Sequence, residues 1–231
     1  MRIVADHLVF RTENPNMVLC TIPEAKTAKD YVAVPYTMQN ATVLRNLGYV
    51  NTPSPITHDY SWPGKYSPFK HQSHTAEFLT LNKRAFCLNG MGTGKTMATL
   101  WAADYLKRQG LINRVLIISP LSTLDVVWGR EIFTSFPHRT YNVLHGTAEK
   151  RRQLLKEPVD YYIINHHGVG VISEDLKNRR DIDLIIIDEA AFYRNSQNKS
   201  WKLLKTLLTP EKWVWGLTGS PTPQAPTDAY G

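Results

Sequence analysis

Two short segments of this sequence carry residue types that bind the phosphates of a nucleotide. The first is the loop Asn89-Gly90-Met91-Gly92-Thr93-Gly94-Lys95-Thr96. Its glycines let the backbone turn with N–H groups facing inward, and the run Lys95–Gln109 is long enough for a helix whose N-terminus favours anions. The second is Asp188-Glu189-Ala190-Ala191, which follows the apolar run 184–187. Together they predict a nucleoside triphosphate site.

Each polar side chain of these segments has an expected role. Lys95 would hold the outer phosphates as a point charge, whereas the Thr96 hydroxyl and the Asp188 carboxylate would hold Mg²⁺ from opposite sides. Glu189 would orient a water molecule. We therefore predict Lys95 and Glu189 as catalytic residues and Thr96 and Asp188 as metal ligands. The predicted nucleotide-binding residues of the loop are Asn89, Gly90, Met91, Gly92, Thr93, Gly94, Lys95 and Thr96.

The order of apolar and helical stretches after residue 60 predicts an α/β fold with a mainly parallel central sheet. The expected strands are Ala85–Leu88, Arg114–Ser119, Thr140–His145, Tyr161–Asn165, Leu184–Asp188 and Trp213–Leu217. The expected helices are Lys95–Gln109, Thr123–Ser135, Ala148–Lys156, Val171–Arg179 and Lys199–Leu208. Functional residues of such a sheet gather where the strands end.

Residues 1–60 predict a separate small α+β domain and linker, so that residues 61–231 form the second domain. Strands are expected at Ile3–Thr12, Met17–Ile22 and Tyr31–Pro35, the first two forming a hairpin, and a short helix at Ala41–Leu47. The Pro-rich stretch 51–64 would be the boundary linker. For the small domain of residues 1–60 a DNA-recognition accessory is one interpretation, and a structural cap is at least as well supported.

Composition places the chain among globular proteins. It has 231 residues, a hydrophobic content of 42% and two cysteines, which excludes a disulfide framework. It lacks an apolar run of membrane-spanning length and an N-terminal secretory signal, so we expect no membrane partner. The expected location is intracellular, either cytoplasmic or nucleoid-associated, and a viral or phage origin is compatible with it.

Positive charge is concentrated after residue 60. Residues 1–60 hold five Lys/Arg and five Asp/Glu, so the whole formal charge of +7 falls in residues 61–231. A basic excess beside a nucleotide site favours a polyanionic partner such as DNA or RNA. Each basic cluster taken alone is more typical of a solvated helix face.

The motifs together resemble a known family. Asn89 stands where the general phosphate-loop template has its first glycine. A phosphate loop without that glycine, followed later in the chain by Asp-Glu-Ala-x, resembles superfamily 2 helicases and translocases. Phe69-Lys70-His71-Gln72, Ile118-Ser119-Pro120-Leu121-Ser122 and Leu217-Thr218-Gly219-Ser220-Pro221 are similar to segments of the first RecA-like motor lobe of the Snf2-related group. The resemblance covers residues 66–231.

This resemblance implies ATP and Mg²⁺ as cofactors and assigns further residues. The Gln72 amide would read the adenine edge. Thr218 and Ser220 would link the Mg²⁺-site carboxylates to the DNA face, and Ala191 replaces the histidine usual in Snf2 relatives. Contacts to the nucleic-acid backbone would come from Ser119, Ser122, His145, Gly146 and Asn165.

The resemblance also implies what must complete the site. Such motors cleave ATP between two RecA-like lobes, and the second lobe supplies an arginine finger. A second lobe is therefore expected, in the same longer chain or in another chain, and the chain alone would be nearly inactive. The leading function is the ATP-binding part of an ATP-dependent DNA helicase or translocase of the remodelling or branch-migration type, acting on double-stranded or branched DNA. An RNA helicase lobe and a noncatalytic nucleotide- or nucleic-acid-binding module remain open.

Overall fold

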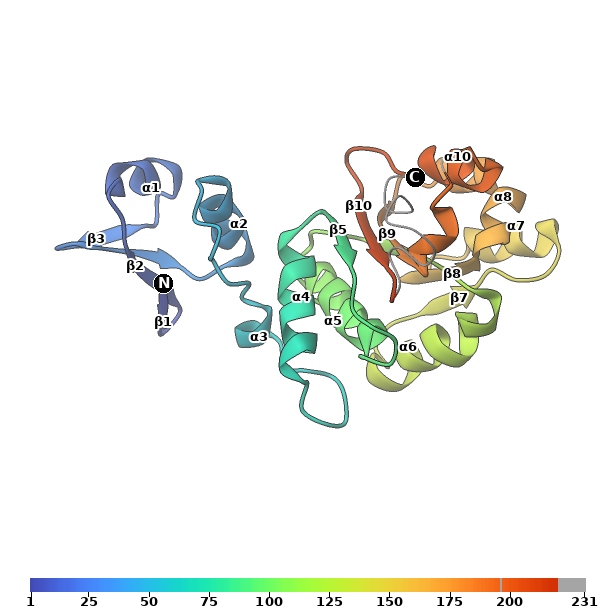
Figure 1. Cartoon of the computed structure of the whole chain (residues 1–231), viewed down its shortest axis with the longest axis horizontal. Coiled ribbons are helices and arrows are strands. Elements are labelled where there is room, and N and C mark those ends of the chain that lie inside the picture. The colour runs from blue at the N-terminus through green and yellow to red at the C-terminus, as the bar shows by residue number, and fades with distance from the viewer. Residues whose placement is uncertain (196, 220–231) are drawn as a thin grey trace. The chain divides into compact units, whose positions relative to one another are not determined.

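The computed structural model describes residues 1–195 and 197–219. The chain divides into two compact units, the first comprising Met1–Ser61 and the second beginning at Trp62 (Figure 1). Each unit has its own sheet. Among the helices of the described residues, none has both the length and the apolar content needed to cross a membrane.

The first unit is a four-stranded antiparallel sheet with short helices. Its strands lie in the order β1-β2-β4-β3. Leu8, Phe10, Val32 and Val34 from the two central strands are buried in the core of this unit. The elements are β1 (Arg2–Val4), β2 (His7–Arg11), α1 (Pro15–Thr21), β3 (Lys26–Ala28), β4 (Tyr31–Pro35), α2 (Met38–Asn46) and α3 (Ile56–Asp59).

The strand predicted at Met17–Ile22 is wrong, because this stretch forms helix α1. Pro15 occupies the first turn, where its missing N–H and fixed φ suit a helix start. Val18 and Ile22 are four residues apart and are both buried in the core that β2 and β4 also line, which is a helical rather than an alternating pattern. The predicted hairpin is therefore also wrong. The strand expected at Ile3–Thr12 is divided into β1 and β2, which pair with each other across a turn at Ala5 (φ 49°).

The second unit contains a six-stranded sheet in the order β5-β10-β9-β6-β8-β7. All five pairings are parallel, which confirms the predicted α/β class. The strands are β5 (Arg84–Cys87), β6 (Arg114–Ser119), β7 (Tyr141–Val143), β8 (Tyr161–Asn165), β9 (Ile182–Asp188) and β10 (Trp213–Leu217).

Helices cover both faces of this sheet, because the chain moves along it in one direction from β5 to β7 and in the other from β7 to β10, and right-handed crossovers then place the helices on opposite faces. Figure 1 shows α4, α5 and α6 on one side and α7, α8 and α10 on the other. The second side buries Leu116, Ile118, Ile185 and Ile187 of β6 and β9 against the helices. The helices are α4 (Lys70–Leu81), α5 (Lys95–Arg108), α6 (Arg130–Ser135), α7 (Ala148–Lys156), α8 (His166–Val171), α9 (Ser173–Lys177) and α10 (Lys199–Lys205).

Two predicted helices have a different form. The stretch predicted as Thr123–Ser135 consists of a 3₁₀ turn η1 (Leu121–Thr123), a π-helix η2 (Leu124–Gly129) and α6. The helix predicted at Val171–Arg179 begins earlier as α8 and breaks at Ile172 before α9. Periodicity alone does not distinguish a π turn from an α turn, because their hydrogen bonds differ by only one residue in span.

Because all six strands are parallel, their carboxyl ends meet at one edge of the sheet. The order of the strands divides this edge into two halves. The ends of β5, β10 and β9 are neighbours and carry the predicted nucleotide-site residues. The ends of β6, β8 and β7 are neighbours and carry the predicted nucleic-acid contacts. The two halves meet where β9 pairs with β6, with Ile187 beside Ile118.

Candidate functional site

The loop between β5 and α5 has the backbone of an anion-binding turn. Gly92 and Gly94 have φ values of 72° and 76°, in the left-handed region that other residues rarely adopt. The Lys95 Nζ donates hydrogen bonds of 2.8 Å to the carbonyl oxygens of Asn89 and Gly90. Helix α5 begins at Lys95, so its free N–H groups lie at the same place as this cation.

Helix α4 supports the loop from one side. The Asn89 side-chain amide donates to Thr75 Oγ1 at 2.7 Å, and Thr75 donates to the His71 carbonyl at 2.7 Å. The His71 ring nitrogen Nε2 lies 3.0 Å from the Thr93 carbonyl. Asn89 therefore has a structural reason to replace the usual glycine, because its amide joins the start of the loop to α4.

Gln72 lies directly against the phosphate loop. Its Oε1 accepts from the Phe69 N–H at 2.9 Å, and its Nε2 donates to the Thr93 carbonyl at 3.3 Å. A Cβ on Gly94 would come within 2.2 Å of Gln72 Nε2. A side chain at position 94 would therefore displace the Gln72 amide, and it would also be strained by the left-handed φ. The second Nε2 hydrogen and the remaining Oε1 lone pair leave Gln72 with both a donor and an acceptor.

Asp188 is the last residue of β9 and Glu189 follows it, and the two side chains differ in solvent exposure. Asp188 is partly buried, and this burial raises the pKa of its carboxyl while the hydrogen bond from Trp128 is the largest effect lowering it. Glu189 is exposed and has φ 52° and ψ 54°, a left-handed conformation that is uncommon for glutamate. Such backbone strain gathers at functional sites, where surrounding contacts hold it.

The residues after β10 close this half of the site. The Thr218 hydroxyl donates to Glu189 Oε1 at 2.9 Å, and the Thr218 N–H donates to the Cys87 carbonyl at the end of β5. A Cβ on Gly219 would lie 3.2 Å from the Met91 nitrogen, so this glycine lets the segment after β10 approach the phosphate loop closely. The structure thus brings Thr218, Glu189 and the loop together. Ser220 lies outside the described residues.

Trp128 is a site residue whose role the sequence did not indicate. Its indole Nε1 donates to Asp188 Oδ2 at 3.0 Å across sixty positions of sequence, and its side chain is 0% exposed. The other oxygen, Oδ1, accepts from the Glu189 backbone N–H at 3.0 Å. Trp128 belongs to the stretch after β6 that resembles the Snf2-related group, but that resemblance assigned it no role, and a tryptophan in a helical pattern is also typical of an ordinary core residue.

The predicted nucleic-acid contacts occupy the other half of the edge with unequal exposure. The Ser119 side chain is 0% exposed and its Oγ accepts from the Thr123 hydroxyl at 3.3 Å, which leaves it no surface for an outside partner. Ser122, His145 and Gly146 are exposed. The structure therefore separates the buried serine that shapes the β6 loop from three exposed positions that can meet a ligand.

Arg151 organises the ends of β7 and β8 and was not predicted from sequence. Its guanidinium donates to the Leu144 carbonyl at 2.5 Å, the Gly146 carbonyl at 3.0 Å and Asn165 Oδ1 at 3.1 Å. It is 7% exposed, and among residues 1–195 and 197–219 no carboxylate pairs with it. Burial lowers the pKa of Arg151, but a guanidinium remains protonated at neutral pH.

This contact decides which way the Asn165 amide points. A guanidinium has only donors, so the atom facing it must be the amide oxygen. The Nδ2 donor of Asn165 is therefore on the opposite side. A Cβ on Gly168 would lie 2.3 Å from Arg151 Nη1 and 2.6 Å from Asn165 Oδ1, so this network requires a glycine at the start of α8.

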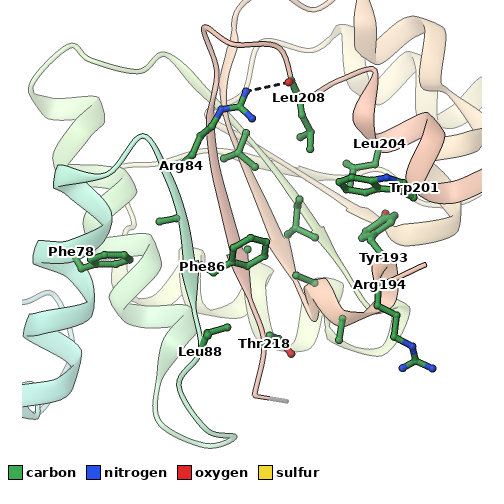
Figure 2. Close-up of a pocket in the computed structure, with 16 residues that line it drawn as sticks. Phe78, Arg84, Phe86, Leu88, Tyr193, Arg194, Trp201, Leu204, Leu208 and Thr218 are labelled. Carbon is green, nitrogen blue, oxygen red and sulfur yellow. Dashed lines mark hydrogen bonds between the residues drawn. The ribbon is translucent and has the colours of Figure 1, made fainter. Parts of the chain in front are cut away.

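An apolar groove of about 620 Å³ lies on the sheet face beside the acidic motif. Figure 2 shows Phe86 and Leu88 of the β5 segment on one side and Trp201 and Leu204 of α10 on the other. Phe86 is 68% exposed. The groove cannot be the triphosphate site, because phosphates need N–H groups and cations, and its lining is dominated by aromatic and aliphatic side chains.

Comparisons with known proteins agree with this arrangement. A Bacillus subtilis protein described as an uncharacterized ATP-dependent helicase, YqhH, is 29% identical over 168 residues, covering 68% of this chain and 27% of that protein. The Arabidopsis thaliana ATP-dependent DNA helicase DDM1 is 30% identical over 139 residues, covering 57% of this chain and 18% of that protein. This chain thus spans only about a quarter or less of the length of these relatives.

A solved structure has the same fold. The Sulfolobus solfataricus SWI2/SNF2 ATPase core in complex with dsDNA superposes with a TM-score of 0.62 and 25% identity, covering 73% of this chain and 35% of that chain. The model of the SNF2-related domain matches residues 71–231, which include the phosphate loop, the acidic motif and the segment after β10. The chain therefore belongs to the SNF2-related domain family.

Proposed function

We propose that this chain is the ATP-binding first lobe of an ATP-dependent DNA translocase or helicase. The observation that carries the proposal is the convergence of three segments at adjacent strand ends. Lys95 follows β5, Thr218 follows β10, and Glu189 follows β9, with Thr218 hydrogen-bonded to Glu189 at 2.9 Å. A carboxylate held beside a phosphate loop by a hydroxyl is suited to orient water toward an outer phosphate.

The residues present fit a magnesium ion. Mg²⁺ prefers oxygen ligands, and the candidates are the Asp188 carboxylate and the Thr96 hydroxyl at the start of α5. Within the described part of the chain, the hydrogen bonds to the Asp188 oxygens come from neutral N–H donors, so no direct ion pair neutralises this partly buried charge. When bound, the ion would neutralise phosphate charge. The chain itself would hold the phosphates through Lys95 and the loop N–H groups.

DNA is the favoured polymer. The similar solved structure is an ATPase core in complex with dsDNA. In this chain the predicted contact Asn165 is only 9% exposed, whereas the exposed Ser122, His145 and Gly146 follow adjacent strand ends. Such groups suit sequence-independent contacts to a phosphate backbone. The basic charge of residues 61–231 supports the same partner.

Calorimetric titration of this chain tests the proposal. We expect weak binding of Mg²⁺-ATP, a preference for ATP over GTP through Gln72, and loss of binding in Lys95→Ala, because that change removes the cation at the outer phosphates. Arg152→Gln is the matched control, because Arg152 is an exposed cation paired with Asp175 at 3.0 Å. Unchanged affinity in Lys95→Ala would refute the site, and equal ATP and GTP affinities would refute the role of Gln72.

A further inference from the structure

The Asp188 carboxylate is held in place by two donors from different parts of the chain. Its Oδ1 accepts from the backbone N–H of the next residue, Glu189, at 3.0 Å, and its Oδ2 accepts from the Trp128 indole at 3.0 Å. The first donor moves with Asp188 itself. Because the second ties the carboxylate to another element, the Trp128 contact determines how the side chain is turned relative to the rest of the lobe.

Trp128 is itself rigidly placed. Its side chain is 0% exposed, and η2 packs against β7 and β8. A Cβ on the next residue, Gly129, would lie 3.0 Å from the Tyr141 ring of β7, so η2 lies close against this strand at that point. An indole fixed by packing is a directional donor at low entropic cost.

Trp128 and Asp188 lie in different halves of the strand-end edge. Trp128 belongs to η2, which follows β6 and the loop 120–123, whereas Asp188 ends β9. β6 and β9 are the two strands at which the halves of the functional edge meet. The indole therefore crosses from the half that bears the expected DNA contacts to the half that bears the nucleotide site.

We propose that Trp128 is a positioning residue that orients the Asp188 carboxylate for the magnesium ion of bound ATP. The inference rests on the proposed function, since it assigns a partner to the predicted metal ligand. Hydrogen bonds to a charged acceptor are stronger than neutral ones, and a partly buried carboxylate that loses such a donor is left undersolvated. A purely structural Trp128 would instead affect folding stability without distinguishing magnesium from other ligands.

The test compares two conservative substitutions in the 231-residue chain. Trp128→Phe removes the N–H and keeps an aromatic ring. Trp215→Phe is the matched control, because Trp215 is also 0% exposed and its Nε1 donates at 3.1 Å to the Asn82 carbonyl, away from Asp188. Calorimetry would measure ATP affinity with Mg²⁺ and with EDTA, and thermal melting would measure stability.

We expect Trp128→Phe to lower the Mg²⁺-dependent gain in ATP affinity by about tenfold, with the affinity in EDTA unchanged. Trp215→Phe should lower the melting temperature without changing that gain. Equal gains in Trp128→Phe and wild type would overturn the inference, as would equal losses in both variants. Wild-type chain that gains no ATP affinity from Mg²⁺ would instead refute the proposed function.

A second measurement does not require Trp128→Phe to fold. The chain has six tryptophans, whose indole N–H groups give separate signals in ¹⁵N-labelled protein. In Asp188→Ala one indole N–H should exchange with solvent faster and shift, and in wild-type protein the same signal should move when Mg²⁺ is added with ATP. Six unchanged indole signals in Asp188→Ala would show that the hydrogen bond does not exist.

Discussion

Asp188 and Glu189 are neighbours in sequence, but their carboxylates have different surroundings. Asp188 is partly buried and accepts from the Trp128 indole and a backbone N–H, whereas Glu189 is exposed and accepts from Thr218. The left-handed backbone of Glu189 turns its side chain away from the direction that an extended strand would impose. One carboxylate is thus suited to a fixed metal ion and the other to a water molecule.

The two acids should therefore respond differently to amide substitution. In protein completed by a second lobe, we expect Glu189→Gln to retain Mg²⁺-ATP binding and to lower kcat by at least about a hundredfold, the scale of a general base. Asp188→Asn should raise the Mg²⁺ concentration needed for half-maximal activity. Steady-state rates with Mg²⁺ titrations measure both effects. Identical profiles for the two variants would contradict the division of roles.

At the scale of elements, short connections bring remote residues together at the strand ends. Helix α7 starts after β7 and returns Arg151 to the loop 144–147, where it meets Asn165 at the end of β8. The 3₁₀ turn η3 (Ala190–Tyr193) follows β9 and packs Phe192 on His166 at 4.5 Å between ring centroids. Each contact joins two segments that lie at the same edge of the parallel sheet.

The Arg151 network predicts a loss of DNA binding that charge alone does not explain. Arg151→Gln should release the Leu144 and Gly146 carbonyls and free the Asn165 amide to rotate, lowering duplex DNA affinity by about tenfold. Arg152→Gln removes the same charge from the neighbouring, exposed position and should have a much smaller effect. Fluorescence anisotropy at fixed salt compares the two. Equal losses would mean that only net charge matters.

His166 predicts a pH dependence of folding stability. It is 6% exposed and lies against Phe192 and Tyr193, and burial lowers its pKa to about 4. The unfolded chain takes up this proton near pH 6.5 and the folded chain only near pH 4. The free energy of unfolding should therefore fall by about 2 kcal/mol as the pH is lowered from about 7 to about 5.

Urea unfolding at both pH values measures this difference, and His166→Phe should reduce it. A difference of the same size in that variant would assign the effect to other groups.

At the scale of the whole molecule, the second unit presents its functional groups along one edge of one sheet. The proposed nucleotide-binding residues follow the ends of β5, β10 and β9, and the candidate DNA contacts follow those of β6, β8 and β7. Phosphoryl transfer in motors of this class also needs positive charge from across a cleft, on the side that a second lobe supplies. A lobe of this kind can bind both ligands while lacking part of the catalytic charge.

The purified chain should therefore bind DNA weakly and hydrolyse ATP slowly. We expect ATPase activity at least about a thousandfold below that of protein completed by a second lobe, the scale of an arginine finger, with no rescue by DNA. DNA affinity should be independent of sequence and should fall only gently as salt rises, because one lobe neutralises few phosphates. Robust DNA-stimulated turnover by the monomeric chain would overturn this prediction, and the exposed Arg194 would then be the first candidate for the missing cation.

The sequence by itself determined the elements and motifs whose signals are local. The strands β6, β8 and β10 match their predicted bounds because continuous apolar runs ended by polar or turn residues define buried parallel strands. The phosphate loop was predictable for the same reason, since its glycines, lysine and threonine stand within one short segment, 89–96. Helix α1 could not be predicted in this way. Its stretch is short, and its apolar residues fit both a strand and a helix until the structure shows which of them are buried.

Only the tertiary structure decided which residues act together. The hydrogen bond from Trp128 to Asp188 spans sixty positions, and that from Thr218 to Glu189 spans twenty-nine. Both depend on the strand order β10-β9-β6, which follows from how the crossover helices pack and not from any local pattern. The sequence could name a serine at the end of β6 as a contact, but only packing shows that Ser119 is buried while Ser122 is exposed. Side-chain direction and burial are properties of the assembled sheet, because each side chain's surroundings come from strands and helices that are distant in sequence.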